Sequence, residues 1–153
     1  KWQRADKCDA KLAQLLLDLH VIDPADERSL ATRNLLRSQS FMLPSGEQVA
    51  ALMGRDQAEI DEVSEAAHDM HAGLHKATPL WLYILLEAAE IGRGGDPKEK
   101  GEGLGPVGGR IVAEVILGLL ECDDRSWLST NRAWSPAEDR GTIAELLHLS
   151  SPS

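Results

Sequence analysis

Three histidines carry the clearest spacing for metal chemistry. His68, His71 and His75 are separated by three and four residues, so on a helix they would lie along one side. Imidazoles one turn apart can converge on a metal ion, but such sites usually have a carboxylate or thiolate ligand as well. The surrounding segment has few apolar anchors. A solvated helix face is therefore the preferred interpretation, with metal binding as the alternative.

A glycine-rich stretch fits the spacing of a dinucleotide-binding loop. Gly103, Gly105 and Gly108 match G-x-G-x-x-G and precede an apolar, helix-like segment. That motif requires a strand immediately before it and free amides facing the pyrophosphate. Here a Gly/Lys/Glu-rich stretch comes before the glycines, and Pro106 has no amide hydrogen. We favour a plain loop over a nucleotide site.

The chain contains two cysteines, Cys8 and Cys122, which can form at most one disulfide. Neither has a neighbouring Cys or His at metal-ligand spacing. Because a free cysteine is usually a small core residue, two buried thiols are the preferred interpretation.

The elements that would position such residues are predicted to be helices, because apolar residues recur at helical spacing and no useful run alternates as in a strand. Ser29 is the predicted cap of a helix with a buried face formed by Leu30, Leu35 and Leu36. Thr78 is the predicted cap of a buried core helix, with Pro79 as its first residue. The predicted helices span residues 10–19, 29 to before Pro44, 47–53 ending at Gly54, 56–75, 80–91, 111–121 and 143–149.

The segment 92–109 has eight glycines and two prolines, which predicts a long flexible loop. The polar segment 56–75 is expected to be mostly solvated. Residues 122–136 are predicted to be an irregular tail that Trp127 and Trp134 help to hold, and residues 150–153 are expected to fray. These features predict one all-α domain over residues 1–153.

The composition and net charge of the chain argue against some classes of binding partner. The chain has 153 residues, 42% of them hydrophobic and 27% charged, which is typical of a globular domain. A net charge of -9 without a basic cluster argues against nucleic acid and against an anionic membrane surface. The longest apolar stretches are far shorter than the roughly 20 residues that a transmembrane helix needs, so no transmembrane segment is predicted. The start at Lys1, without Met, suggests a piece of a longer chain.

Several motifs, in order along nearly the whole chain, resemble animal-type haem peroxidases, especially their bacterial relatives. In that family an Asn stands three residues before an Arg and ten before a Pro, as Asn34, Arg37 and Pro44 do here. Other matching segments are residues 4–11, the start of a core helix at 78–81, and a C-terminal signature helix at 103–114 followed by 118–120. The sequence Gln39-Ser40-Phe41 departs from a charged run found in many members, and residues 96–100 are inserted.

The resemblance implies roles for two residues. Asn34 matches the Asn whose side-chain oxygen accepts the ring N–H of the iron-bound proximal histidine, a bond that orients the ligand and raises its basicity. Arg37 matches an Arg one turn along, near the haem and its propionates, where a guanidinium suits a carboxylate. Without the resemblance, Asn34 would be a polar residue on a helix face. A structural salt bridge is the alternative for Arg37.

The implied fold is the irregular, multi-helix C-terminal region of a haem peroxidase, with a long glycine-rich loop. The implied cofactor is haem, and the implied partners are the remainder of the peroxidase polypeptide, hydrogen peroxide, and a small-molecule or lipid substrate. None of the five histidines stands where the proximal one belongs, and the distal His and Arg belong to earlier segments. The chain alone is therefore expected to be inactive. The alternative is a haem-free helical binding or scaffold module.

Overall fold

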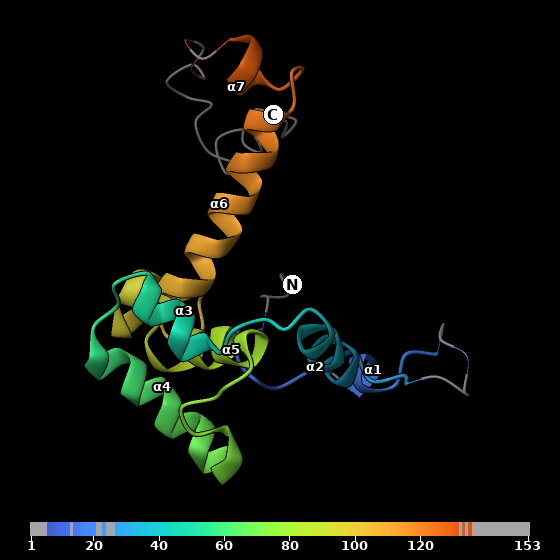
Figure 1. The fold of residues 1–153 in the computed structure, drawn as a ribbon, viewed down its shortest axis with the longest axis vertical. Coiled ribbons are helices and arrows are strands. Elements are labelled where there is room, and N and C mark those ends of the chain that lie inside the picture. Colours follow the sequence, from blue (N-terminus) through green and yellow to red (C-terminus); the bar gives the residue numbers. More distant parts are fainter. Residues whose placement is uncertain are drawn as a thin grey trace, which may run out of the picture. The chain divides into compact units, whose positions relative to one another are not determined.

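The computed structural model describes residues 6–12, 14–20, 23, 27–131, 133 and 135, and the described part is helical without any strand (Figure 1). It divides into two compact units, residues 1–112 and 113–153. The helices are α1 (Gln14–Leu17), α2 (Leu30–Ser40), α3 (Gly46–Leu52), α4 (Gln57–Met70), α5 (Leu80–Glu90), α6 (Pro106–Cys122) and α7 (Trp127–Thr130), with short 3-10 turns η1 (Ala72–Leu74), η2 (Arg93–Gly95) and η3 (Pro97–Glu99).

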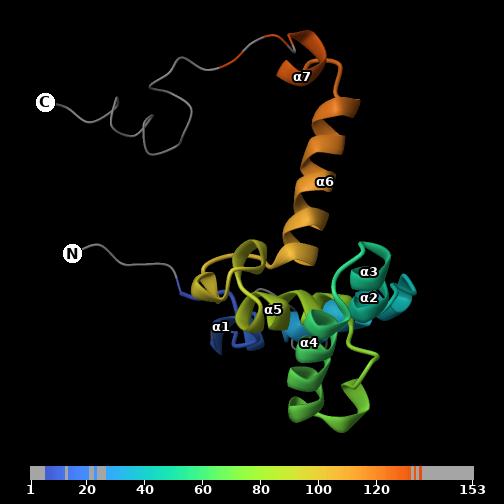
Figure 2. The ribbon, with the colours of Figure 1, turned by 90° about the vertical axis from the view of Figure 1, so that its left-hand side faces the viewer.

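The core of the first unit forms where α3 and α4 pack against α5, and these helices lie side by side in both views (Figures 1 and 2). Tyr83 and Val63 are its largest fully buried apolar side chains. Burial of such side chains contributes about 1.5–3 kcal/mol each. The remaining members of the core are Ala50, Ile60, Ala67, Leu86, Ile91 and Val107.

Local signals fix several helix ends, of which the cap at Ser29 and the end at Gly54 were predicted. The Ser29 hydroxyl accepts the amide of Thr32 at 3.3 Å and so caps α2. Ser45 and Gln48 exchange hydrogen bonds in a capping box at the start of α3. Gly54 follows the end of α3 and has φ +74°. A glycine suits this position because, without a Cβ, it adopts the left-handed conformation that ends a helix at little steric cost.

The structure corrects the bounds or the burial of other predicted helices. The helix predicted over 56–75 ends at Met70. Most of its residues are exposed, as predicted, but Ile60, Val63 and Ala67 are buried against α5. Their spacing of three and four residues forms a narrow apolar stripe on an otherwise charged helix. The helix predicted over 10–19 is only α1. In α2 no side chain is fully buried, and half of Leu36 is exposed.

The glycine-rich segment is shorter as a loop than predicted. Two 3-10 turns interrupt it, and α6 already begins at Pro106, where a proline is favoured because the first helical residues lack amide partners. In the second unit, a four-residue helix, α7, interrupts the predicted irregular tail. The predictions for Trp134, residues 143–149 and the frayed end fall outside the described residues.

Among the described residues, no helix combines the length and apolarity needed to cross a bilayer.

Candidate functional site

Asn34 and Arg37 lie one turn apart on α2, and their side chains are in direct contact. Nη2 of Arg37 donates a hydrogen bond to Oδ1 of Asn34. The hydroxyl of Ser38 donates to the backbone oxygen of Asn34 at 3.0 Å. Arg37 thus binds an amide oxygen rather than a carboxylate, so the predicted alternative of a structural salt bridge is not what the described residues show.

These two residues line a groove of about 370 Å³ between α2, from its middle to its C-terminal end, and the N-terminal half of α5. Three polar side chains, Asn34, Arg37 and Ser38, all come from α2. The rest of the lining is apolar and comes from α5 and from the end of α2 with the turn after it: Phe41, Leu43, Leu80, Trp81 and Ile84. Phe41 is 74% exposed, so the groove has an apolar rim in solvent.

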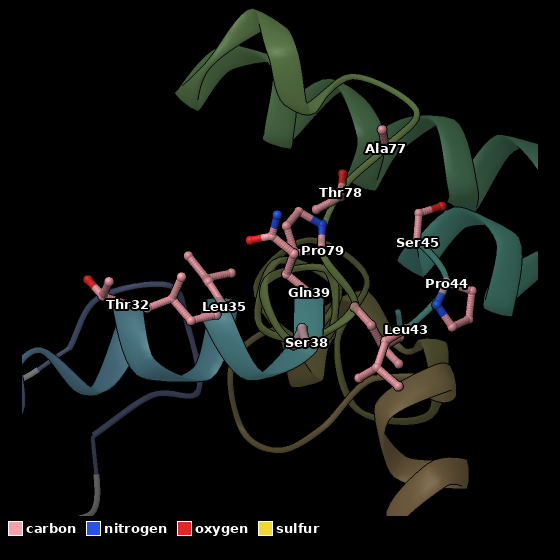
Figure 3. Close-up of a pocket in the computed structure, with 12 residues that line it drawn as sticks. Thr32, Leu35, Ser38, Gln39, Leu43, Pro44, Ser45, Ala77, Thr78 and Pro79 are labelled. Carbon is pink, nitrogen blue, oxygen red and sulfur yellow. The ribbon is translucent and has the colours of Figure 1, made fainter. Parts of the chain in front are cut away.

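A second groove, of about 510 Å³, lies against another side of α2 (Figure 3). Its walls are α2, the turn at Pro44 and Ser45, and the segment 77–80 that leads into α5. Among the described residues that line it, none is charged. Ser38, Leu43 and Leu80 line both grooves, which therefore adjoin each other.

A buried carboxylate fixes the start of α5, which forms one wall of both grooves. Glu47 on α3 accepts the Thr78 hydroxyl at 2.6 Å and the Thr78 amide at 3.1 and 3.2 Å. The Thr78 hydroxyl therefore binds Glu47 instead of capping the next helix, and Pro79 precedes the first helical residue, Leu80. The predicted roles of Thr78 and Pro79 at this helix start are corrected accordingly.

A second buried carboxylate holds the start of α6. Glu87 accepts the amide of Val107 at 2.9 and 3.1 Å and that of Gly108 at 3.1 Å. Desolvation raises the pKa of Glu87, and the two amide hydrogen bonds oppose that rise. Burial, followed by the nearby charge of Glu87, raises the pKa of Tyr83 as well.

These contacts bear on the G-x-G-x-x-G spacing, for which a plain loop is the favoured interpretation over a dinucleotide site. Two of the amides that would face a pyrophosphate already donate to Glu87. A Cβ on Gly105 would lie 2.5 Å from Cγ of Glu87, so this glycine permits the close approach of a side chain rather than of a phosphate. The geometry favours the plain-loop interpretation.

The three histidines do not form one row. His68 is in the last turns of α4, His71 ends that helix, and His75 follows η1. The rings of His68 and His75 meet edge to face with centroids 5.2 Å apart, and Nδ1 of His75 lies 3.9 Å from a Glu65 oxygen. Among the described residues, no group of three or more His, Cys, Asp or Glu side chains is arranged to hold a metal ion.

The cysteines are free, but the prediction that both are buried is wrong. Cys8 is partly exposed and Cys122, at the end of α6, is exposed. An apolar helix end does not bury a thiol unless another element covers it.

The sequence identified the polar wall of the smaller groove but not its apolar wall. Asn34 and Arg37 belong to a motif, whereas Trp81 and Phe41 join them only because α2 packs against α5. Glu47 and Glu87 were also missed, since each binds backbone 20 or more residues away. A charged residue inside an apolar helix, such as Glu87, is the one signal that could have indicated a buried carboxylate.

Comparisons of the chain with protein-family models, with curated proteins and with solved structures yield no match.

Proposed function

We propose that this chain is the C-terminal part of a haem-dependent peroxidase and supplies proximal-side support for the haem pocket. One observation carries the proposal: Asn34 and Arg37, the two residues that the family resemblance selects, together line an apolar groove beside Trp81. Their place one turn apart on α2 puts both side chains on the same face of the helix, toward the wall that α5 provides.

Asn34 suits the role of hydrogen-bond acceptor for a proximal histidine. An amide oxygen has two lone pairs, and Arg37 uses one of them. The other can accept the ring N–H of a histidine contributed by a segment outside this chain. That bond would fix the tautomer of the ligand and raise its basicity.

Arg37 suits a propionate of the cofactor. Its guanidinium has five N–H donors, and one of them is directed to Asn34. The remaining donors can bind a carboxylate, while the apolar wall with Trp81 and Ile84 would exclude water from the porphyrin edge. The residues present therefore fit an amphipathic, carboxylate-bearing cofactor.

Haem, when bound, supplies the iron that reacts with hydrogen peroxide and the oxidising power for an organic donor, a halide or a fatty acid. The contribution of this chain is to hold and orient. Among the described residues, no histidine lines the groove. The iron ligand and the distal residues are thus assigned to the remainder of the polypeptide, and the chain alone is expected to be inactive.

Exposed apolar surface supports the remainder of the polypeptide as the partner. In the first unit, Phe41, Met42 and Leu43 are exposed in succession beside the grooves. Within α6, Val115, Ile116 and Leu119 are each more than half exposed. Contiguous apolar surface of this kind usually marks an interface.

The test uses the complete polypeptide that contains this chain. Haem is titrated in, and the Soret band, the reduction potential and peroxide turnover are compared with those of Asn34→Ala. Loss of the acceptor should raise the potential, because a less basic ligand stabilises ferric iron less. Turnover should fall by about 10–100-fold.

Ser40→Ala is the matched control. Ser40 lies on the same helix, is exposed, and donates only to the backbone oxygen of Leu36 at 2.9 Å. Haem binding with an unchanged Soret band and potential in Asn34→Ala would refute the role of Asn34. A complete polypeptide that binds no haem would refute the peroxidase function.

The second candidate is a haem-free binding module, for which the two largely apolar grooves would be the binding surface. The two candidates differ in whether the preceding part of the polypeptide contains a distal and a proximal histidine.

A further inference from the structure

The polar wall of the smaller groove carries hydrogen-bond donors of Arg37 and Asn34 that meet no carboxylate among the described residues. Arg37 has four N–H groups beyond the one given to Asn34, and the described residues place no carboxylate against them. The side-chain nitrogen of Asn34 likewise has no acceptor among the described residues. These free donors leave the guanidinium of Arg37 able to bind an anion at the edge of the groove.

The opposite wall is apolar and partly aromatic. Trp81 and Phe41 both line it, and Ile84 continues it along α5. Aromatic rings favour offset or edge-to-face contact with a flat aromatic ligand. A ligand that satisfies both walls has a flat apolar body with an anionic acceptor at one end.

We propose that this groove, in the chain as it stands, binds small aromatic carboxylates, with the carboxylate on Arg37 and Asn34 and the ring against Trp81. The inference concerns the groove of the proposed function but does not rest on haem binding. Its donors, volume and apolar wall come from α2, α5 and the turn after α2 alone.

The test is a titration of the 153-residue chain with 2-naphthoate, followed by ¹H–¹⁵N NMR. The signals of the Trp81 indole and the Asn34 side-chain amide should shift and saturate together. The uncharged analogue 2-naphthalenemethanol should bind at least about tenfold more weakly, because it lacks the charge-assisted hydrogen bonds.

Two variants locate the carboxylate. Arg37→Gln should weaken 2-naphthoate binding at least about tenfold and should weaken binding of the alcohol much less, because the alcohol has no charge for the guanidinium to pair with. Arg33→Gln is the matched control, because Arg33 lies on the same helix outside the groove lining and donates to the backbone oxygen of Glu27. It should change binding by less than about twofold.

Absence of a saturable shift at Trp81 and Asn34 would overturn the inference. So would equal affinity for acid and alcohol, or equal loss in the two arginine variants. Because haem reconstitution is measured in the complete polypeptide and naphthoate binding in this chain, either proposal can fail without the other.

Discussion

Helices α5 and α6 have similarly apolar sequences but differ in how far they are covered. In α5, Tyr83, Leu86, Glu87 and Ala88 are buried under α3, α4 and the segment that begins α6. In α6 only Val107 and Gly108 are buried, and most large apolar side chains after Val112 are exposed. Apolar composition therefore predicts that a helix will be covered, but not whether this chain provides the cover.

The largest expected difference in stability is between a leucine-to-alanine substitution in α5 and the same substitution in α6. Leu86 is 6% exposed and Leu119 is 67% exposed. Leu86→Ala should lower the free energy of unfolding by about 2–5 kcal/mol, because it leaves a cavity in the core. Leu119→Ala should change it by less than about 0.5 kcal/mol.

Urea unfolding followed by far-UV circular dichroism measures both values. Equal losses in the two variants would mean that α6 is covered within this chain, and the contrast between the helices would not hold.

Features of the fold could be predicted from the sequence where they depend on residues close together in the chain. Ser29 and Gly54 were identified because caps and helix ends depend on a few neighbouring residues. The buried stripe of α4, formed by Ile60, Val63 and Ala67, was not identified, because charged residues separate its members in the sequence. The contacts of Glu47 and Glu87 link residues 20 to 31 positions apart, and no local pattern specifies such pairs.

The candidate site divides in the same way. Asn34 and Arg37 follow from a motif within one helix, so the sequence sufficed to select them. Trp81 belongs to a separate helix, and its place in the groove depends on the packing of α2 against α5. Helical spacing brings Arg37 and Asn34 close enough for their hydrogen bond. The bond also depends on the rotamers of the two side chains, which the spacing does not determine.

Replacing either of two helical glycines by alanine should change the stability less than Leu86→Ala does, and in opposite directions. A Cβ on Gly46 would lie 2.0 Å from Cγ of the fully buried Tyr83, whereas a Cβ on Gly118 of α6 meets nothing within 4 Å. Gly46→Ala should destabilise the chain by about 1–3 kcal/mol through overpacking. Gly118→Ala should stabilise its helix by about 0.5–1 kcal/mol, because alanine is the better helix former.

Thermal and urea unfolding of both glycine variants check this pair. A stabilised Gly46→Ala variant would show that the packing of α3 against Tyr83 is looser than the structure has it.

The smallest effect concerns Glu87, the residue that ties α5 to the beginning of α6. Its pKa is raised above 4.5, first of all by burial, although Val107, Gly108 and the charge of Arg55 favour the ionised form. The other charged or titratable groups around it are Glu59, which raises its pKa further, and Tyr83. A carboxyl with a raised pKa in the folded state binds a proton more tightly folded than unfolded.

The stability that Glu87 contributes is therefore fully present below about pH 4.5 and is lost as the pH rises through the higher pKa of the folded state. Glu87→Gln removes this titration. The unfolding free energy of the wild type minus that of Glu87→Gln should thus decrease from pH 4 to pH 8, measured in urea at constant ionic strength. An increase over the same range would mean that the hydrogen bonds from Val107 and Gly108 outweigh burial, so that the start of α6 is held by the ionised carboxylate.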